Sequence, residues 1–173
     1  MPQKMLPPNV TVWWVPLTPG IEDIDAPAAT EINAGTNISC AIVDPYTLGW
    51  TDRDTDDSAS ICDDSNVETP TRKNYEGNLN LFRDQNLSDN TSVFNTAVNL
   101  FKTPLQPGFL VQRVGKNPNT FPQAADGDEV SVFEFLSGDP NIVKDNNAPV
   151  QAQIRFYAQG RSSNGLVTVG GAS

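Results

Sequence analysis

Two stretches of the chain alternate between apolar and polar residues, and this pattern constrains the fold more than any other feature. Within 71–83 the apolar residues Tyr75, Leu79 and Leu81 fall on one side of an extended chain. The other side carries the polar residues Asn74, Glu76, Asn78 and Asn80. The segment 150–159 alternates in the same way. A period of two with one polar face is typical of a half-buried antiparallel strand, so both segments predict strands with one wet face.

Short runs of β-branched and aromatic residues, bounded by Pro, Gly or Asn, predict further strands. These runs are Val10–Val15, Ile38–Val43, Phe109–Val114, Glu129–Leu136 and Leu166–Val169. In the run 129–136, Val130 and Val132 are expected on one face, and Phe133 and Phe135 on the other. A strand that is apolar on both faces needs cover on both sides of its sheet.

The period changes once along the chain, where apolar residues recur at the spacing of a helix. They are Val93, Phe94, Ala97, Leu100 and Phe101. This spacing predicts one helix over about 90–102, capped by Asp89 or Thr91 and limited by Pro104. The expected fold is therefore mainly β: an antiparallel sandwich or barrel with one flanking helix.

The chain of 173 residues suits a single domain, 1–173, with room for extensions. We expect an N-terminal arm over 1–9, a long acidic loop over 44–69 and a flexible C-terminal tail over 170–173. A loop of about 25 residues is unusual in a compact domain, and such loops usually have a function or are disordered in isolation.

The net charge of −10 is concentrated in one part of the sequence. Residues 21–68 contain twelve acids and a single base, Arg53, whereas the remainder contains ten bases and nine acids. Such a surface repels nucleic acid phosphates, which argues against sequence-reading DNA binding. No run approaches the roughly 20 apolar residues that span a bilayer, and 1–8 lacks the pattern of a secretory signal, so we expect synthesis in the cytoplasm and no membrane partner.

The sequence lacks most of the usual catalytic equipment. It contains no His, and its two cysteines, Cys40 and Cys62, are expected to be free thiols, with Cys40 buried. We therefore predict no enzyme, no catalytic residue and no cofactor. A hydrolase that uses a pair of acids, for example within Asp56–Asp57 or Asp63–Asp64, would still need a cleft that places them on opposite sides.

The acidic segment contains a weak match to a calcium loop. Asp52, Asp54, Asp56 and Asp63 take ligand positions, but the sixth position is Asp57 instead of Gly and the twelfth is not Glu. We therefore predict no metal, and instead expect either a solvated acidic loop or a loop that contacts a neighbouring subunit. The candidate interface residues are Asp52, Asp54, Asp56, Asp57, Asp63 and Asp64.

The pair Trp13–Trp14 allows two interpretations. It could form a platform on which a sugar stacks, as in a monomeric calcium- or carbohydrate-binding sandwich. A pair of adjacent Trp residues in a strand more often places one ring in a core and the other at an interface, and we favour that interpretation.

Several strings, in order and spacing over about 10–160, resemble the major tail proteins of long-tailed, non-contractile bacteriophages that infect actinobacteria. They are Trp14–Asp23, Glu31–Cys40, Asp52–Ser58, Ile61–Asp63, Thr69–Arg72, Asn74–Gly77 and Gly108–Lys116. The resemblance implies a tail tube subunit with a β-sandwich or barrel and a flanking helix. It carries no catalytic motif.

The resemblance further implies that six copies form a ring with an inner barrel of strands, and that rings stack helically into a hollow tube. The expected partners are other copies of the chain and the tape measure, tail terminator and distal tail proteins, with DNA passing without adhesion. The protein would be a virion component assembled in the host cytoplasm. The polar residues Asn74, Glu76, Asn78 and Asn80 are candidates for the lumen. A tail terminator or completion protein, which stops at one ring, is an alternative.

Overall fold

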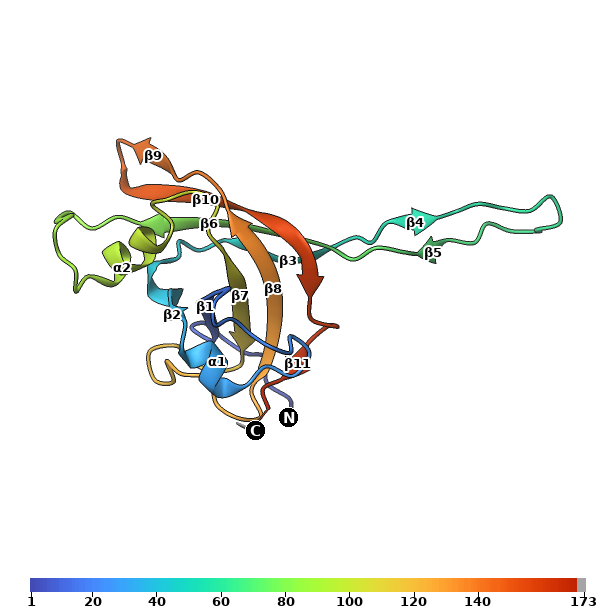
Figure 1. Ribbon diagram of the computed structural model, residues 1–173, viewed down its shortest axis with the longest axis horizontal. Coiled ribbons are helices and arrows are strands. Elements are labelled where there is room, and N and C mark those ends of the chain that lie inside the picture. Colours follow the sequence, from blue (N-terminus) through green and yellow to red (C-terminus); the bar gives the residue numbers. More distant parts are fainter. Residues whose placement is uncertain (171–173) are drawn as a thin grey trace.

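The computed structural model describes residues 1–170, and within them nine strands form one antiparallel sheet. Its order is β2-β1-β7-β8-β10-β6-β3, with β11 added beside β8 and β9 beside β10 (Figure 1). The bounds are β1 Val10–Pro16, β2 Thr36–Asn37, β3 Thr47–Thr51, β6 Asn74–Phe82, β7 Pro107–Val114, β8 Glu129–Ser137, β9 Asn141–Asp145, β10 Ala148–Ser162 and β11 Val167–Thr168. The expected mainly β, antiparallel fold is confirmed.

The two alternating stretches form β6 and β10, which pair with each other as neighbours. Leu79 and Leu81 of β6 and Ile154 of β10 are fully buried on one side of the sheet. Glu76 and Asn78 are exposed on the other. At the far end of β10 the pairing with β8 shifts register between Ala158 and Ser162, where Gly160 has a φ of 88°. Glycine adopts this conformation without strain, which allows β10 to bend there.

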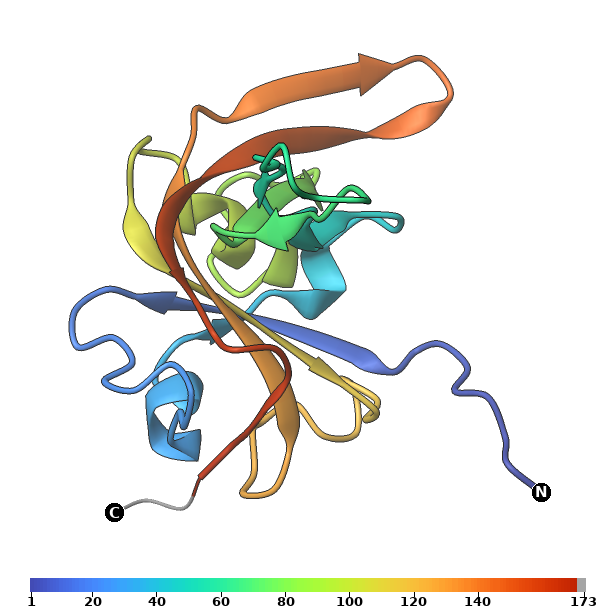
Figure 2. The ribbon, with the colours of Figure 1, turned by 90° about the vertical axis from the view of Figure 1, so that its right-hand side faces the viewer.

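β8 is covered on both faces, as its sequence predicts. Phe133 and Phe135 pack in the larger core with residues of β6, β10 and α2, the helix Val93–Leu100. Val130 and Val132 pack in a second core on the opposite face. β8 lies in a strongly curved sheet, and its two faces contribute side chains to the two cores (Figure 2).

Both tryptophans of β1 are buried, which corrects the expectation of one core ring and one interface ring. Trp13 is 1% exposed in the second core, and Trp14 is 2% exposed in the larger core. Because they are adjacent in the strand, the two tryptophans point to opposite faces of the sheet, and both faces are covered. Neither ring is available to stack against a sugar.

α2 occupies Val93–Leu100, within the predicted range, but its buried face differs by part of a turn from the predicted one. Ser92 is the N-cap residue, in place of Asp89 or Thr91. Val93, part of the predicted apolar face, is exposed, whereas Asn95, which that face does not include, is buried. The Asn95 side-chain amide donates hydrogen bonds to the backbone carbonyls of Asn86 and Asp89, which satisfies its polar atoms and closes the preceding loop.

Other local predictions need correction. The segment 38–43, predicted as a strand, contains the 3₁₀ helix η1, Ser39–Ala41, because Ser39 turns back to accept a hydrogen bond from the backbone N–H of Val12. Cys40 is therefore exposed on this turn instead of buried, and both cysteines are free thiols. The helix α1, Ala29–Asn33, and strand β2 also form, in a stretch for which the sequence predicts no regular element.

The acidic segment 44–69 is not a simple loop. It begins with β3, which pairs with β6, and continues into a long two-stranded hairpin that contains β4, Thr55–Asp56, and β5, Thr69–Pro70. This hairpin, residues 51–73, projects far from the body along the longest axis of the molecule, and we call it the arm (Figure 1). Every residue from Thr51 to Arg72 is exposed.

The N-terminal segment 1–9 forms no strand and extends away from the sheet (Figure 2). Of the predicted C-terminal tail, Gly170 is held by a hydrogen bond from its N–H to the carbonyl of Pro27, at 3.0 Å. The other tail residues, 171–173, lie outside the described residues. Among the helices of residues 1–170, none has the length and apolar character needed to span a membrane.

Candidate functional surfaces

The arm is the first candidate surface, and its base is fixed firmly to the body. The Lys73 ammonium donates hydrogen bonds to the carbonyl of Ser162 and the side chain of Asn164, both at 3.0 Å. The indole N–H of Trp50 donates to the Ser162 hydroxyl at 3.1 Å. Since Trp50 and Lys73 lie on either side of the hairpin, these contacts set the direction in which the arm leaves the sheet.

The outer arm, residues 55–70, is strongly acidic, and within residues 1–170 no hydrogen bond or ion pair joins it to the body. Residues 51–72 contain seven acids and two bases. Ile61 and Val67 are exposed as well, so the arm presents both apolar and charged groups. An isolated two-stranded hairpin is at best marginally stable in water. The arm therefore lacks, within its own subunit, the packing that stabilises a hairpin.

The six acidic residues predicted as an interface all lie on this arm: Asp52, Asp54, Asp56, Asp57, Asp63 and Asp64. Four of them were also the weak calcium candidates, and three of those carboxylates are engaged separately. That of Asp54 accepts from Asn74, that of Asp56 from the N–H of Ser58, and that of Asp63 from the N–H of Ser60. Within residues 1–170 no three acidic or cysteine side chains gather as a metal site would require.

The pKa of Asp56 is lowered by the hydrogen bonds from Ser58, and that of Asp89 by those from Thr91. A carboxyl group that acts as a general acid near neutral pH needs a raised pKa instead. The lowered pKa values of these two exposed carboxyl groups therefore do not suit the general acid of such a pair.

The second candidate surface is the polar face of the sheet. Asn74, Glu76, Asn78 and Asn80 do share one face of β6, as the alternation predicts. Gln153 and Arg155 of β10 lie opposite Asn80 and Asn78, and Asn141 of β9 continues the row beside Gln153. The face is therefore rich in side-chain amides, and it extends over three neighbouring strands, β6, β10 and β9.

The four β6 residues do not play the same part. Glu76 and Asn78 are exposed, whereas Asn80 is half-buried and its amide donates to Gln151 at 3.1 Å. Asn74 lies at the base of the arm, where its amide donates to the carbonyl of Asp52 and the carboxylate of Asp54. Asn74 thus braces the arm, and the open polar surface begins at Glu76.

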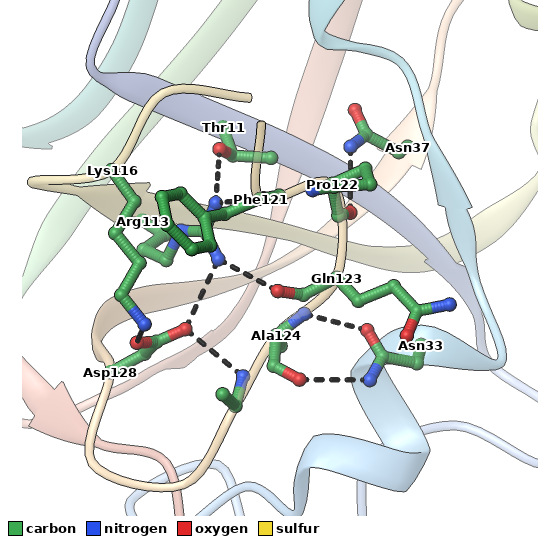
Figure 3. A network of polar contacts seen from close by, with 11 residues as sticks. Thr11, Asn33, Asn37, Arg113, Lys116, Phe121, Pro122, Gln123, Ala124 and Asp128 are labelled. Atoms are coloured by element: carbon green, nitrogen blue, oxygen red, sulfur yellow. Dashed lines mark hydrogen bonds and ion pairs between the residues drawn. The ribbon is translucent and has the colours of Figure 1, made fainter. Parts of the chain in front are cut away.

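A third feature, which the sequence did not reveal, is a buried ion pair between Arg113 of β7 and Asp128 (Figure 3). The Arg113 guanidinium is 1% exposed and donates to Asp128 at 3.1 Å, to the Thr11 hydroxyl at 2.8 Å and to the carbonyl of Gln123 at 2.8 Å. The carbonyl of Phe121 accepts a further bond. One cation thereby ties β1 and β7 to the loop 115–128.

The same loop is held from its other side by α1. The Asn33 side chain donates to the carbonyl of Ala124 at 2.9 Å and accepts from its N–H at 2.7 Å (Figure 3). Asn37 donates to the carbonyl of Pro122. The network is structural: it substitutes polar side chains for the regular hydrogen bonds that a loop lacks.

Asp128 links the stability of this network to pH. Burial raises its pKa, but hydrogen bonds from Lys116, Ala125 and Arg113 outweigh burial and leave the pKa below its ordinary value. The unfolded chain therefore binds more protons, and the stability from Asp128 is present above the unfolded pKa of about 4 and is lost as pH falls through the folded pKa.

We expect Asp128→Asn to lower the melting temperature at pH 7 and to flatten its fall as pH drops below about 4, because the variant lacks this proton uptake. Thermal unfolding followed by circular dichroism across that range tests it. Asp126→Asn, at an exposed acid in the same loop, is the matched control. An acid transition equally steep in Asp128→Asn and wild type would contradict the linkage.

Comparison with known proteins adds the following. A family model described as phage tail tube protein matches residues 1–171. One solved structure, titled the anti-feeding prophage baseplate determined by cryo-electron microscopy with six-fold symmetry, aligns over 98% of each chain at 11% identity and a TM-score of 0.47. No curated protein matches the sequence.

Proposed function

Because this chain belongs to the phage tail tube protein family, and is thereby a structural component of a virion, we propose that it self-assembles into hexameric rings that stack into a hollow tube. The tube is the conduit through which the phage genome leaves the particle. The proposal includes the finer resemblance to long-tailed, non-contractile phages of actinobacteria, assembly in the host cytoplasm, and contacts with the tape measure, tail terminator and distal tail proteins.

The observation that carries the proposal is the arm. It holds 22 consecutive exposed residues, Thr51–Arg72, on a base that is rigidly attached to the sheet. A subunit that worked alone would gain nothing from fixing the direction of an unsupported hairpin. In a stack of rings, the arm reaches a neighbouring subunit or the next ring, which supplies the contacts that it lacks.

The amide-rich face of the sheet suits the lumen. Asn78, Asn80, Gln151 and Gln153 offer hydrogen bonds to water without a charge, and Glu76 and Arg155 add one charge of each sign. Affinity for DNA arises mainly from cations that neutralise phosphates. A wall of amides with few unpaired cations lets DNA slide without adhesion.

Negative-stain electron microscopy of the purified protein, with sedimentation velocity in parallel, tests the proposal. We expect hollow tubes of uniform diameter, in equilibrium with smaller species. Rings that do not stack at any concentration would support the alternative of a tail terminator or completion protein. Protein that stays monomeric under all conditions, including those that favour assembly, would contradict both.

A further inference from the structure

Two of the sheet's edge strands, β3 and β9, lie at opposite borders of one four-stranded section, β9-β10-β6-β3. Within residues 1–170, β3 pairs only with β6, and β9 pairs only with β10. The residues of β9 are all exposed. Open edges expose backbone groups that form hydrogen bonds readily with another strand, so proteins normally cover or pair them.

The two edge strands are equal in length, and their opposite directions suit antiparallel pairing between copies. β3 and β9 each have five residues. Successive strands of the section are antiparallel, so β3 and β9 run in opposite directions. If a second copy is placed beside the first by rotation about an axis near the strand direction, its β3 approaches β9 in the antiparallel sense. The pattern then continues without a break around a closed barrel.

We infer that β3 of one copy pairs with β9 of the next, in the register that overlaps both strands fully. This register places Thr47 opposite Asp145, Gly49 opposite Val143 and Thr51 opposite Asn141. The inference rests on the proposed function and names the edges through which a ring closes. It is a head-to-tail contact between different surfaces, which forms rings when the rotation closes.

The faces of the two strands agree in this register. Gly49 lies beside Glu76 and Asn141 beside Gln153, so both belong to the polar face. Trp50 lies beside Tyr75 and Ile142 beside Ala152, so both belong to the core side. A shift by one residue would mix the two faces. Full overlap keeps each face of the sheet on the same side from copy to copy.

The pairing also covers apolar surface that a single copy leaves open. Ile142 is 50% exposed, and it would lie opposite Trp50 of the neighbour, which is partly buried in its own core. Lys144 would lie opposite Leu48, where its aliphatic stem covers the leucine while its ammonium stays in water. Aromatic and β-branched cross-strand pairs stabilise sheets, so this contact favours the proposed register.

Cysteine cross-linking tests the inference. In the background Cys40→Ser and Cys62→Ser, the double variant Thr47→Cys and Asp145→Cys places one thiol on each edge. Residues opposite each other in an antiparallel pair have Cα atoms about 4.5–5.5 Å apart, which suits a disulfide. With diamide as oxidant, assembled protein is expected to form a ladder of covalent oligomers that ends at the ring, seen on non-reducing gels.

The matched control is Thr47→Cys with Lys144→Cys, in which the second thiol lies on the opposite face, and each single cysteine variant is a further control. None of these is expected to form the ladder. Tubes or rings visible by electron microscopy without a ladder from the Thr47–Asp145 pair would overturn the edge assignment and leave the proposed function intact. Protein that neither assembles nor cross-links would overturn both.

Discussion

Replacing the outer arm, Thr55–Pro70, by a two-residue Asn-Gly turn is expected to give a folded subunit that forms no tubes. The remaining ends meet where the N–H of Thr71 bonds to the carbonyl of Asp54, so a tight hairpin turn closes them without strain. The replaced residues are all exposed, and surface changes alter stability little, typically within about 0.5 kcal/mol. Thermal unfolding and negative-stain microscopy measure the two properties separately.

A length-preserving control separates the arm itself from its charge. In it, the tip acids Asp56, Asp57, Asp63 and Asp64 are all replaced by Asn. If shape and backbone contacts hold the tube together, this control still polymerises, with an altered dependence on salt. Tubes of normal length from the shortened variant would show that the arm has no part in assembly.

Arg113→Leu is expected to lower the free energy of unfolding by about 3–5 kcal/mol, because it leaves the Asp128 carboxylate buried with only Lys116 as a cationic partner. For a domain of this size, that corresponds to a fall of about 10 °C in melting temperature. Urea unfolding of the subunit measures the change directly. Because a smaller fraction of subunits is then folded, their assembly into tubes should weaken as well.

Arg161→Met provides the matched control, since Arg161 pairs with Glu134 at the surface and is about half exposed. Exposed pairs contribute at most about 1 kcal/mol. A loss for Arg113→Leu no larger than that for Arg161→Met would mean that the buried network does not stabilise the loop 115–128. Replacing Arg113 and Asp128 together by apolar residues should recover part of the loss, because no charge is then left unpaired.

The regular part of the fold could be predicted from the sequence because burial there follows backbone geometry. β6 and β10 face solvent on one side, so their residues alternate, and β8 lies between two cores, so both of its faces are apolar. α2 lies where the sequence predicts it, but the predicted apolar face does not include Asn95. Its amide is buried because it meets two backbone carbonyls, and hydropathy patterns do not register such partners.

The arm and the Arg113 network could not be predicted in the same way. The arm has no buried face, so its strands leave no apolar period, and only its length and charge indicated a special role. Arg113 follows Val111 on the same side of β7, a position that suits an apolar residue. Its partners Asp128 and Thr11 come from distant parts of the chain. No local pattern brings these three together.

Charge concentration predicted the candidate interface on the arm, and alternation predicted the polar face of β6. Both surfaces are accessible to solvent in the subunit. The structure added what connects them: Asn74 belongs to both, because it ends the polar row of β6 and holds the first acids of the arm. The orientation of the arm relative to the polar face is therefore fixed within the subunit, before any assembly.

A cryo-electron microscopy reconstruction of tubes assembled from the purified protein tests the central claim most directly. The account predicts stacked six-fold rings, with the arm lying against a neighbouring copy and the face of Asn78, Asn80 and Gln153 lining the lumen. A reconstruction in which the arms project freely into solvent, or in which a ring of Lys and Arg side chains lines the channel, would contradict it.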